Sequence, residues 1–162
     1  MEYLQQAQER LKQQAGSAGP GTNRPEDHSV TQAPPLIYSS TRAITLSEQL
    51  MRDQRLISGH AEGPFVDAYK RLRAQVMQQF RQKEWNVLGI SSPTAHEGKT
   101  LTAVNLSLAL AMDLAHTVML VDADMHRPSV HRLFGLDQAQ GLTEYLFDQV
   151  PLTQLLIHPG VG

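Results

Sequence analysis

The sequence contains no cysteine, which excludes disulfide bonds and thiolate metal sites. It also has no apolar run of the roughly 18–20 residues that a membrane-spanning helix needs. The longest candidate, Ala103 to Ala115, is interrupted by Asn105, Ser107 and Asp113. The net charge is only -2, so there is no electrostatic reason to expect a nucleic-acid partner. The N-terminus lacks the basic and apolar regions of a signal peptide, and we therefore expect a soluble, cytoplasmic protein.

Three regions follow one another along the chain. Residues 1–15 place leucine and alanine at helical spacing and predict a short amphipathic helix, for which a partner-docking role and a frayed terminus remain open. Residues 16–64 are rich in glycine, proline and small polar residues, which predicts a mostly disordered linker with a weak helical patch from Leu46 to Leu56. Residues 65–162 read as the N-terminal part of a folded domain.

That domain begins with a helix and continues in an alternating pattern. The helix, over residues 65–81, has one apolar face. A strand is predicted at Val87–Ile90, a helix at 98–115 and a second strand at Val118–Val121, followed by short helices at 128–134 and 142–146. A strand–helix–strand unit of this length predicts an α/β fold with a parallel sheet. The apolar face of the first helix, over residues 65–81, is formed by Phe65, Tyr69, Leu72, Val76 and Phe80.

A loop between the first predicted strand and the second helix has the composition of a phosphate-binding site. This phosphate loop, residues 91–100, reads Ser-Ser-Pro-Thr-Ala-His-Glu-Gly-Lys-Thr. Unpaired N–H groups at a helix start attract anions, and Lys99 adds a cation for the β- and γ-phosphates. The hydroxyl of Thr100 is a suitable Mg²⁺ ligand. Because Pro93 replaces the first glycine of the full P-loop pattern, the loop alone is also compatible with a surface turn.

Two carboxylates at the end of the second predicted strand strengthen the phosphate reading. Asp122 and Asp124 follow Val118–Val121 directly. Ligands of open α/β sheets bind at the carboxyl ends of strands, where both the loop and these aspartates are expected. Acidic side chains at a buried strand end favour a cation such as that of Mg²⁺–ATP. The alternative is that they only cap the turn toward Pro128.

These residues resemble a known family. Gly98-Lys99-Thr100, then Thr102-Ala-Val-Asn-Leu-Ser107 and Val121-Asp-Ala-Asp-Met-His-Arg-Pro-Ser129, are similar to the bacterial tyrosine autokinases (BY-kinases) of exopolysaccharide export, in particular the branch found with exosortase loci. The resemblance implies a P-loop NTPase fold, ATP and Mg²⁺ as cofactors, and a catalytic set of Lys99, Asp122 and Asp124. It also implies metal ligation by Thr100, Asp122 and Asp124. The implied nucleotide-binding residues are Thr94, Ala95, His96, Glu97, Gly98, Lys99, Thr100 and Leu101.

The resemblance also implies partners. Family members carry a charged helix motif for ring assembly, and Asp67, Lys70 and Arg73 occupy the matching positions here. A solvated helix face is the alternative reading of these three residues. The expected partners are other copies of the chain and a membrane-bound chain-length-determinant protein, which would place the chain at the inner membrane without a span of its own.

The sequence departs from the family pattern at several positions, and these departures lead to expectations about the backbone and the activity. Ala95-His96 replaces the common Pro-Gly, which predicts a strained backbone at His96. His126 stands where the family has arginine, with Arg127 following. The Walker B aspartate and the C-terminal tyrosines would lie beyond Gly162, so the chain alone is expected not to autophosphorylate.

Two other functions remain as alternatives. One is a MinD/ParA-like switch ATPase, although the signature lysine of that class falls at Thr94. The other is a non-catalytic, nucleotide-binding adaptor of the exporter.

Overall fold

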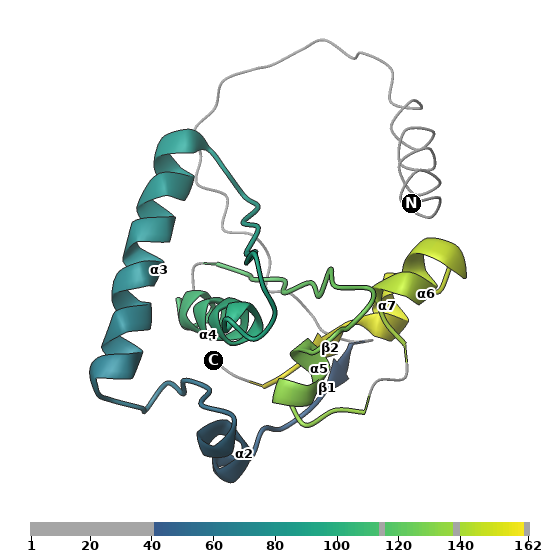
Figure 1. Ribbon diagram of the computed structural model, residues 1–162, viewed down its shortest axis with the longest axis horizontal. Helices are drawn as coiled ribbons and strands as arrows, with labels where there is room; N and C mark the ends of the chain where they lie inside the picture. Colours follow the sequence, from purple (N-terminus) through teal and green to yellow (C-terminus); the bar gives the residue numbers. More distant parts are fainter. Residues whose placement is uncertain (1–40, 114–115, 138–139, 161–162) are drawn as a thin grey trace, which may run out of the picture. The chain divides into compact units, whose positions relative to one another are not determined.

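The computed structural model describes residues 41–113, 116–137 and 140–160 (Figure 1). The predicted helix over residues 1–15 lies outside this range. The elements, in chain order, are β1 (Arg42–Ala43), α2 (Glu48–Asp53), α3 (Pro64–Lys83), α4 (Lys99–Ala111), α5 (Val130–Leu133), α6 (Leu142–Phe147), α7 (Leu152–Leu155) and β2 (Ile157–His158). Every helix predicted within the described range is present, with small shifts of its ends.

Local sequence signals account for the first two helices. The Ser47 side chain accepts a hydrogen bond from the backbone N–H of Leu50 and caps α2. Pro64 opens α3, where its fixed φ angle suits the first helical position and its missing N–H costs nothing. The α3 helix ends at Lys83, and the next residue, Glu84, adopts a left-handed conformation with φ of 55°.

The core lies where α3, α4 and the segment before α3 pack together. Its buried residues come from both helices and from the segment 51–57, which the sequence assigned to the linker. This part of the predicted linker is therefore packed, and α2 confirms the helical patch predicted within it. The apolar side chains of this proline- and glycine-rich stretch pack against α4. Composition alone does not show that such a packing surface is available. The cluster comprises Met51, Leu56, Ile57, Val66, Val104, Leu108 and Ala109.

A buried asparagine fixes that packing. Asn105 is fully buried on α4. Its side-chain oxygen accepts the backbone N–H of Ile57 at 2.8 Å, and its amide donates to the carbonyl of Arg55 at 3.0 Å. The first hydrogen bond satisfies the N–H of a buried residue that would otherwise be unpaired, and the second bonds a carbonyl of the same irregular segment. Asn105 thus joins the chain before α3 to α4.

The predicted parallel sheet is not present in the described residues. Residues 87–90 and 118–121 are not strands, and Val87 and Met119 are 81% and 66% exposed. The prediction of strands at these two positions is therefore wrong for this structure. A parallel strand is stabilised by hydrogen bonds to neighbouring strands, and the described part of the chain provides none for either segment.

A different parallel pair occurs in the structure. Arg42 pairs with Ile157 and Ala43 with His158, and the N–H of Ile44 extends the pairing to the carbonyl of His158 at 2.9 Å. Gly160 follows with φ of 62°, and a Cβ there would lie 2.9 Å from the carbonyl oxygen of Ile44. Position 160, two residues beyond this pair, therefore favours glycine. The molecule combines helices with a small parallel sheet, which is compatible with the α/β class.

The described residues contain no helix that is both long enough and apolar enough to cross a membrane.

Candidate functional site

The phosphate loop leads directly into α4, as the sequence predicts. Gly98 precedes the helix with φ of 85°, a left-handed conformation that glycine adopts at little cost. Its carbonyl accepts the N–H of Thr102 at 2.8 Å, which starts the helical hydrogen bonding. The N–H groups of Lys99, Thr100 and Leu101 belong to the first helical turn and have no intrahelical acceptor. This end of α4 therefore presents N–H donors and a partial positive charge.

His96 carries the backbone strain that the sequence predicts. Its φ angle is 64°, in the left-handed region that non-glycine residues rarely occupy. Glycine, which is common at this place in the family that the sequence resembles, adopts that conformation without strain. The loop thus keeps its turn despite the histidine.

A side-chain clip holds the loop closed. The Thr94 hydroxyl donates to one carboxylate oxygen of Glu97 at 2.6 Å, and the Thr94 N–H approaches the other at 3.4 Å. The Ser92 hydroxyl donates to the carbonyl of Thr94 at 3.0 Å. The hydrogen bond from the Thr94 hydroxyl is the main reason that the pKa of Glu97 lies below its ordinary value. Glu97 is therefore a carboxylate that orders the loop while its own charge stays exposed.

The acidic loop, Asp122–Ser129, is closed by one of its own carboxylates. One oxygen of Asp122 accepts the backbone N–H groups of Ser129 at 2.7 Å and Val130 at 3.0 Å. The other oxygen accepts the N–H of Asp124 at 3.1 Å. Asp122 thus fills the capping role that the sequence left as an alternative, since it satisfies two N–H groups at the start of α5.

The two loops meet through two side-chain contacts. The ammonium group of Lys99 lies 3.5 Å from a carboxylate oxygen of Asp124. The hydroxyls of Thr100 and Ser129 lie 3.0 Å apart, and either can be the donor. The fold therefore places Lys99 and Thr100 beside the loop that carries both predicted aspartates.

Asp124 has a lowered pKa. Its pKa is lowered chiefly by the backbone N–H of Arg127, which donates to it at 3.0 Å, and further by the charge of Lys99. Because Lys99 and Asp124 each expose more than a third of their side chains, their ion pair contributes little to folding stability. The ion pair matters because it joins the phosphate loop to the acidic loop.

The two loops carry oxygen donors of the kind that Mg²⁺ prefers. Within the described ranges, no three histidine, cysteine, aspartate or glutamate side chains gather around a common point. Mg²⁺ is usually held by one or two carboxylates together with phosphate oxygens and water. Thr100, Asp124 and the oxygen of Asp122 that accepts a single hydrogen bond are the oxygen donors here. This chain would therefore hold the metal jointly with phosphate.

The three residues predicted for ring assembly differ in their surroundings. Asp67 and Lys70 are half exposed on α3, with the ammonium and carboxylate 4.0 Å apart. The guanidinium of Arg73 instead donates to the carbonyl of Ala109 at 3.1 Å. Because Ala109 lies in the last turn of α4, Arg73 has a partner within its own chain at the negative end of that helix.

Two residues of the site region were not predicted from the sequence. Ser129, the last residue of the acidic loop, contacts Thr100 of the phosphate loop, and Asn105 anchors α4 to the segment before α3. A polar residue on the apolar side of a helix is a signal for Asn105, because such a residue needs a buried partner. A hydroxyl at the start of a predicted helix is a weaker signal for Ser129.

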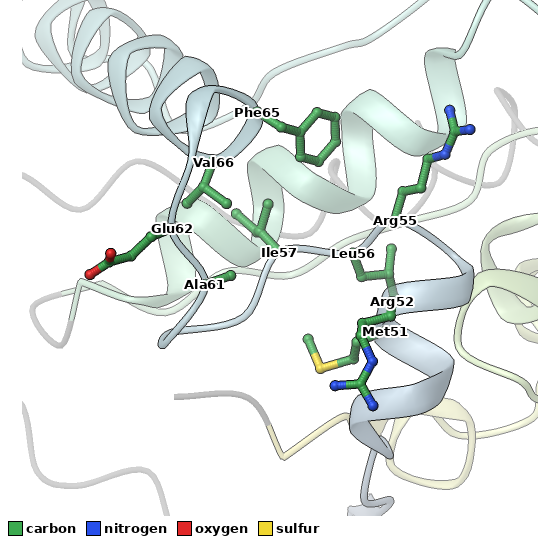
Figure 2. Close-up of a pocket in the computed structure, with 9 residues that line it drawn as sticks. All are labelled: Met51, Arg52, Arg55, Leu56, Ile57, Ala61, Glu62, Phe65 and Val66. Carbon is green, nitrogen blue, oxygen red and sulfur yellow. The ribbon is translucent and has the colours of Figure 1, made fainter.

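An open pocket of about 430 Å³ lies elsewhere, over the start of α3 (Figure 2). It shares no residue with the phosphate loop or the acidic loop, so it gives no support to the nucleotide site. Its buried lining is formed by Met51, Leu56, Ile57 and Val66, and Arg52, Arg55, Ala61, Glu62 and Phe65 complete it.

Comparison with known proteins supports the resemblance seen in the sequence. No family model matches the chain, and no solved structure matches it. Tyrosine-protein kinase etk of Escherichia coli is 32% identical over 97 residues, which are 60% of this chain and 13% of that protein. Tyrosine-protein kinase ptk of Acinetobacter johnsonii is 30% identical over 96 residues, which are 59% of this chain and 13% of that protein.

A third relative is shorter. Tyrosine-protein kinase YwqD of Bacillus subtilis is 31% identical over 88 residues, 54% of this chain and 37% of that protein. The chain thus matches between about an eighth and just over a third of the length of these relatives. Several kinases that agree in name match more than half of the chain, and this similarity shows a relationship to the bacterial tyrosine-protein kinases.

Proposed function

We propose that the chain binds Mg²⁺–ATP at the phosphate loop and serves in a protein-tyrosine autokinase that regulates polysaccharide chain length or export. The observation that carries the proposal is the contact between the two loops. Lys99 lies 3.5 Å from Asp124, and the Thr100 hydroxyl reaches the acidic loop at Ser129. A cationic side chain for the phosphates, a hydroxyl that can ligate the metal, and carboxylates are the groups that a magnesium–nucleotide complex requires in one place.

Each part of the site has a distinct role in this proposal. Thr94 to Leu101 would surround the phosphates with N–H groups, and Lys99 would leave Asp124 for the β- and γ-phosphates. Thr100, Asp122 and Asp124 would hold Mg²⁺, which neutralises phosphate charge when bound. The lowered pKa of Asp124 supports this role, because a metal ligand must be deprotonated.

The family relationship extends the proposal to partners. Asp67 and Lys70 are exposed on α3 and available for contacts between copies of the chain. Arg73 is less available, since it is bonded to α4. The second proposed partner is a membrane-bound chain-length-determinant protein.

The test is binding of a fluorescent ATP analogue to the purified chain, with Mg²⁺ and with EDTA. We expect Lys99→Ala to weaken binding on the order of a hundredfold, because a charge-assisted phosphate contact is lost. Lys83→Ala, at the exposed end of α3, is the matched control and should bind as the wild type does. Equal affinities for Lys99→Ala and Lys83→Ala would refute the phosphate-loop assignment.

Kinase activity needs a separate measurement. The chain is incubated with Mg²⁺–ATP, and phosphotyrosine is sought by mass spectrometry at Tyr3, Tyr38, Tyr69 and Tyr145. We expect no modification of the chain alone. Stoichiometric phosphorylation that disappears in Lys99→Ala would contradict this expectation and show that these residues suffice for transfer.

A further inference from the structure

Ser129 occupies the junction between the two loops of the candidate site. Its hydroxyl lies 3.0 Å from that of Thr100, 29 residues earlier in the chain. Its backbone N–H donates to Asp122 at 2.7 Å, and the N–H of Val130 donates to the same oxygen at 3.0 Å. One short stretch is thus tied by its backbone to a predicted metal ligand and by its side chain to another.

The chemistry of a hydroxyl gives this contact a meaning. A threonine hydroxyl has one proton and two lone pairs. When the oxygen of Thr100 turns a lone pair toward a cation, its proton must point to some acceptor. In the described part of the chain, the Ser129 oxygen is the side-chain atom within hydrogen-bond distance of that hydroxyl.

The backbone of Ser129 is held independently of its side chain. The hydrogen bonds to Asp122 come from backbone N–H groups, which remain when the side chain is changed. The residue that carries the acceptor for Thr100 is therefore held in the acidic loop by the carboxylate of Asp122. Groups that orient metal ligands in this way commonly contribute ten- to a hundredfold to metal affinity.

We propose that Ser129 is a positioning residue of the magnesium–nucleotide site, accepting a hydrogen bond from the Thr100 hydroxyl and so leaving a lone pair of the Thr100 oxygen for the metal. This inference rests on the proposed function and deepens it. Ser129 acts on the metal through Thr100, and it has no contact with the phosphates in this account.

The experiment compares nucleotide affinity in Mg²⁺ with affinity in EDTA, and the ratio gives the magnesium enhancement. For Ser129→Ala we expect the enhancement to fall about tenfold, with unchanged affinity in EDTA. Ser129→Thr keeps a hydroxyl and should restore the enhancement. Ser107→Ala removes a half-buried hydroxyl from α4 at a site away from the acidic loop and should behave as the wild type.

A second variant covers the possibility that alanine unfolds the loop. Ser129→Cys has a similar size but a weak acceptor, so it should lose the enhancement as alanine does. Thermal unfolding without ligand establishes that each variant is folded before its affinity is interpreted.

The outcomes separate the inference from the proposed function. If the wild type binds with a magnesium enhancement that Ser129→Ala retains, the inference is wrong and the proposed function stands. If Ser129→Ala lowers affinity equally in Mg²⁺ and EDTA, the hydroxyl supports the loop as a whole and the inference is also wrong. If the wild type binds no nucleotide under either condition, the proposed function fails and the inference fails with it.

Discussion

The segment that precedes α3 and the two segments that flank α4 in sequence differ in how completely they are packed. Leu56 and Ile57 of the first are buried in the core with Val104, and Asn105 is fully buried where it bonds to Ile57. In the flanking segments, 87–90 and 118–121, Leu120 packs against the core, but Val87 and Met119 are largely exposed. Each segment contains apolar residues, so their presence alone does not explain the difference. A helix satisfies its own backbone and needs one apolar surface, whereas a strand needs hydrogen-bonding neighbours as well.

The largest expected effect is at the contact between α4 and the segment that precedes α3. Asn105→Ala removes both hydrogen bonds to the irregular segment and leaves the N–H of Ile57 buried without an acceptor. We expect the free energy of unfolding to fall by about 3 kcal/mol. Urea unfolding measures this change, with Ser107→Ala on the same helix as the control. A loss no larger than that of the control would mean that the segment does not depend on Asn105.

The difference in packing is tested by the same substitution, valine to alanine, at a buried position of α4 and at an exposed position of a flanking segment. Val104→Ala removes two buried methyl groups and should lower the free energy of unfolding by about 2 kcal/mol. Val87→Ala removes the same atoms from an 81% exposed side chain and should cost under about 0.5 kcal/mol. Similar losses for the two variants in urea would show that residue 87 is packed in solution and that the contrast is false.

A smaller effect concerns how α3 is held against α4. Arg73→Ala removes the hydrogen bond to the carbonyl of Ala109 and should cost about 1 kcal/mol. Arg71→Ala, on an exposed position of the same helix, should leave stability unchanged. Light scattering on both variants adds a second readout. Normal stability with loss of self-association in Arg73→Ala would favour the ring-contact role over the intrachain one.

The smallest effect is a titration in the acidic loop. The pKa of Asp124 lies below its ordinary value, because the Arg127 N–H and then Lys99 favour the charged form. The contacts of the anion are therefore present above the ordinary pKa and are lost as pH falls through the lowered one. NMR titration in Lys99→Ala should move the pKa partway back toward the ordinary value. An unchanged pKa would place Lys99 away from Asp124 in solution.

Helices and turns of this protein could be predicted well from the sequence. The apolar period of residues 65–81 and the helix start at Gly98-Lys99-Thr100 are short-range signals, and each has its counterpart in the structure. The strain at His96 was predictable for the same reason, since a turn that favours glycine imposes its φ angle on whatever residue stands there. The two strands were not predictable in this way. An apolar run of strand length shows that a segment could pair with a neighbouring strand, but not that such a strand is present.

The candidate site divides along the same line. The sequence by itself determined the kinds of groups present: a glycine–lysine–threonine loop at a helix start, and two aspartates one residue apart. Tertiary structure decided which groups meet. Thr100 reaches Ser129 across 29 positions, Arg73 reaches Ala109 across 36, and Asn105 reaches Ile57 across 48. Residue types and short spacings fix local conformation, but contacts over such separations arise only once the helices have packed, because the chain must first be brought together around a shared apolar core.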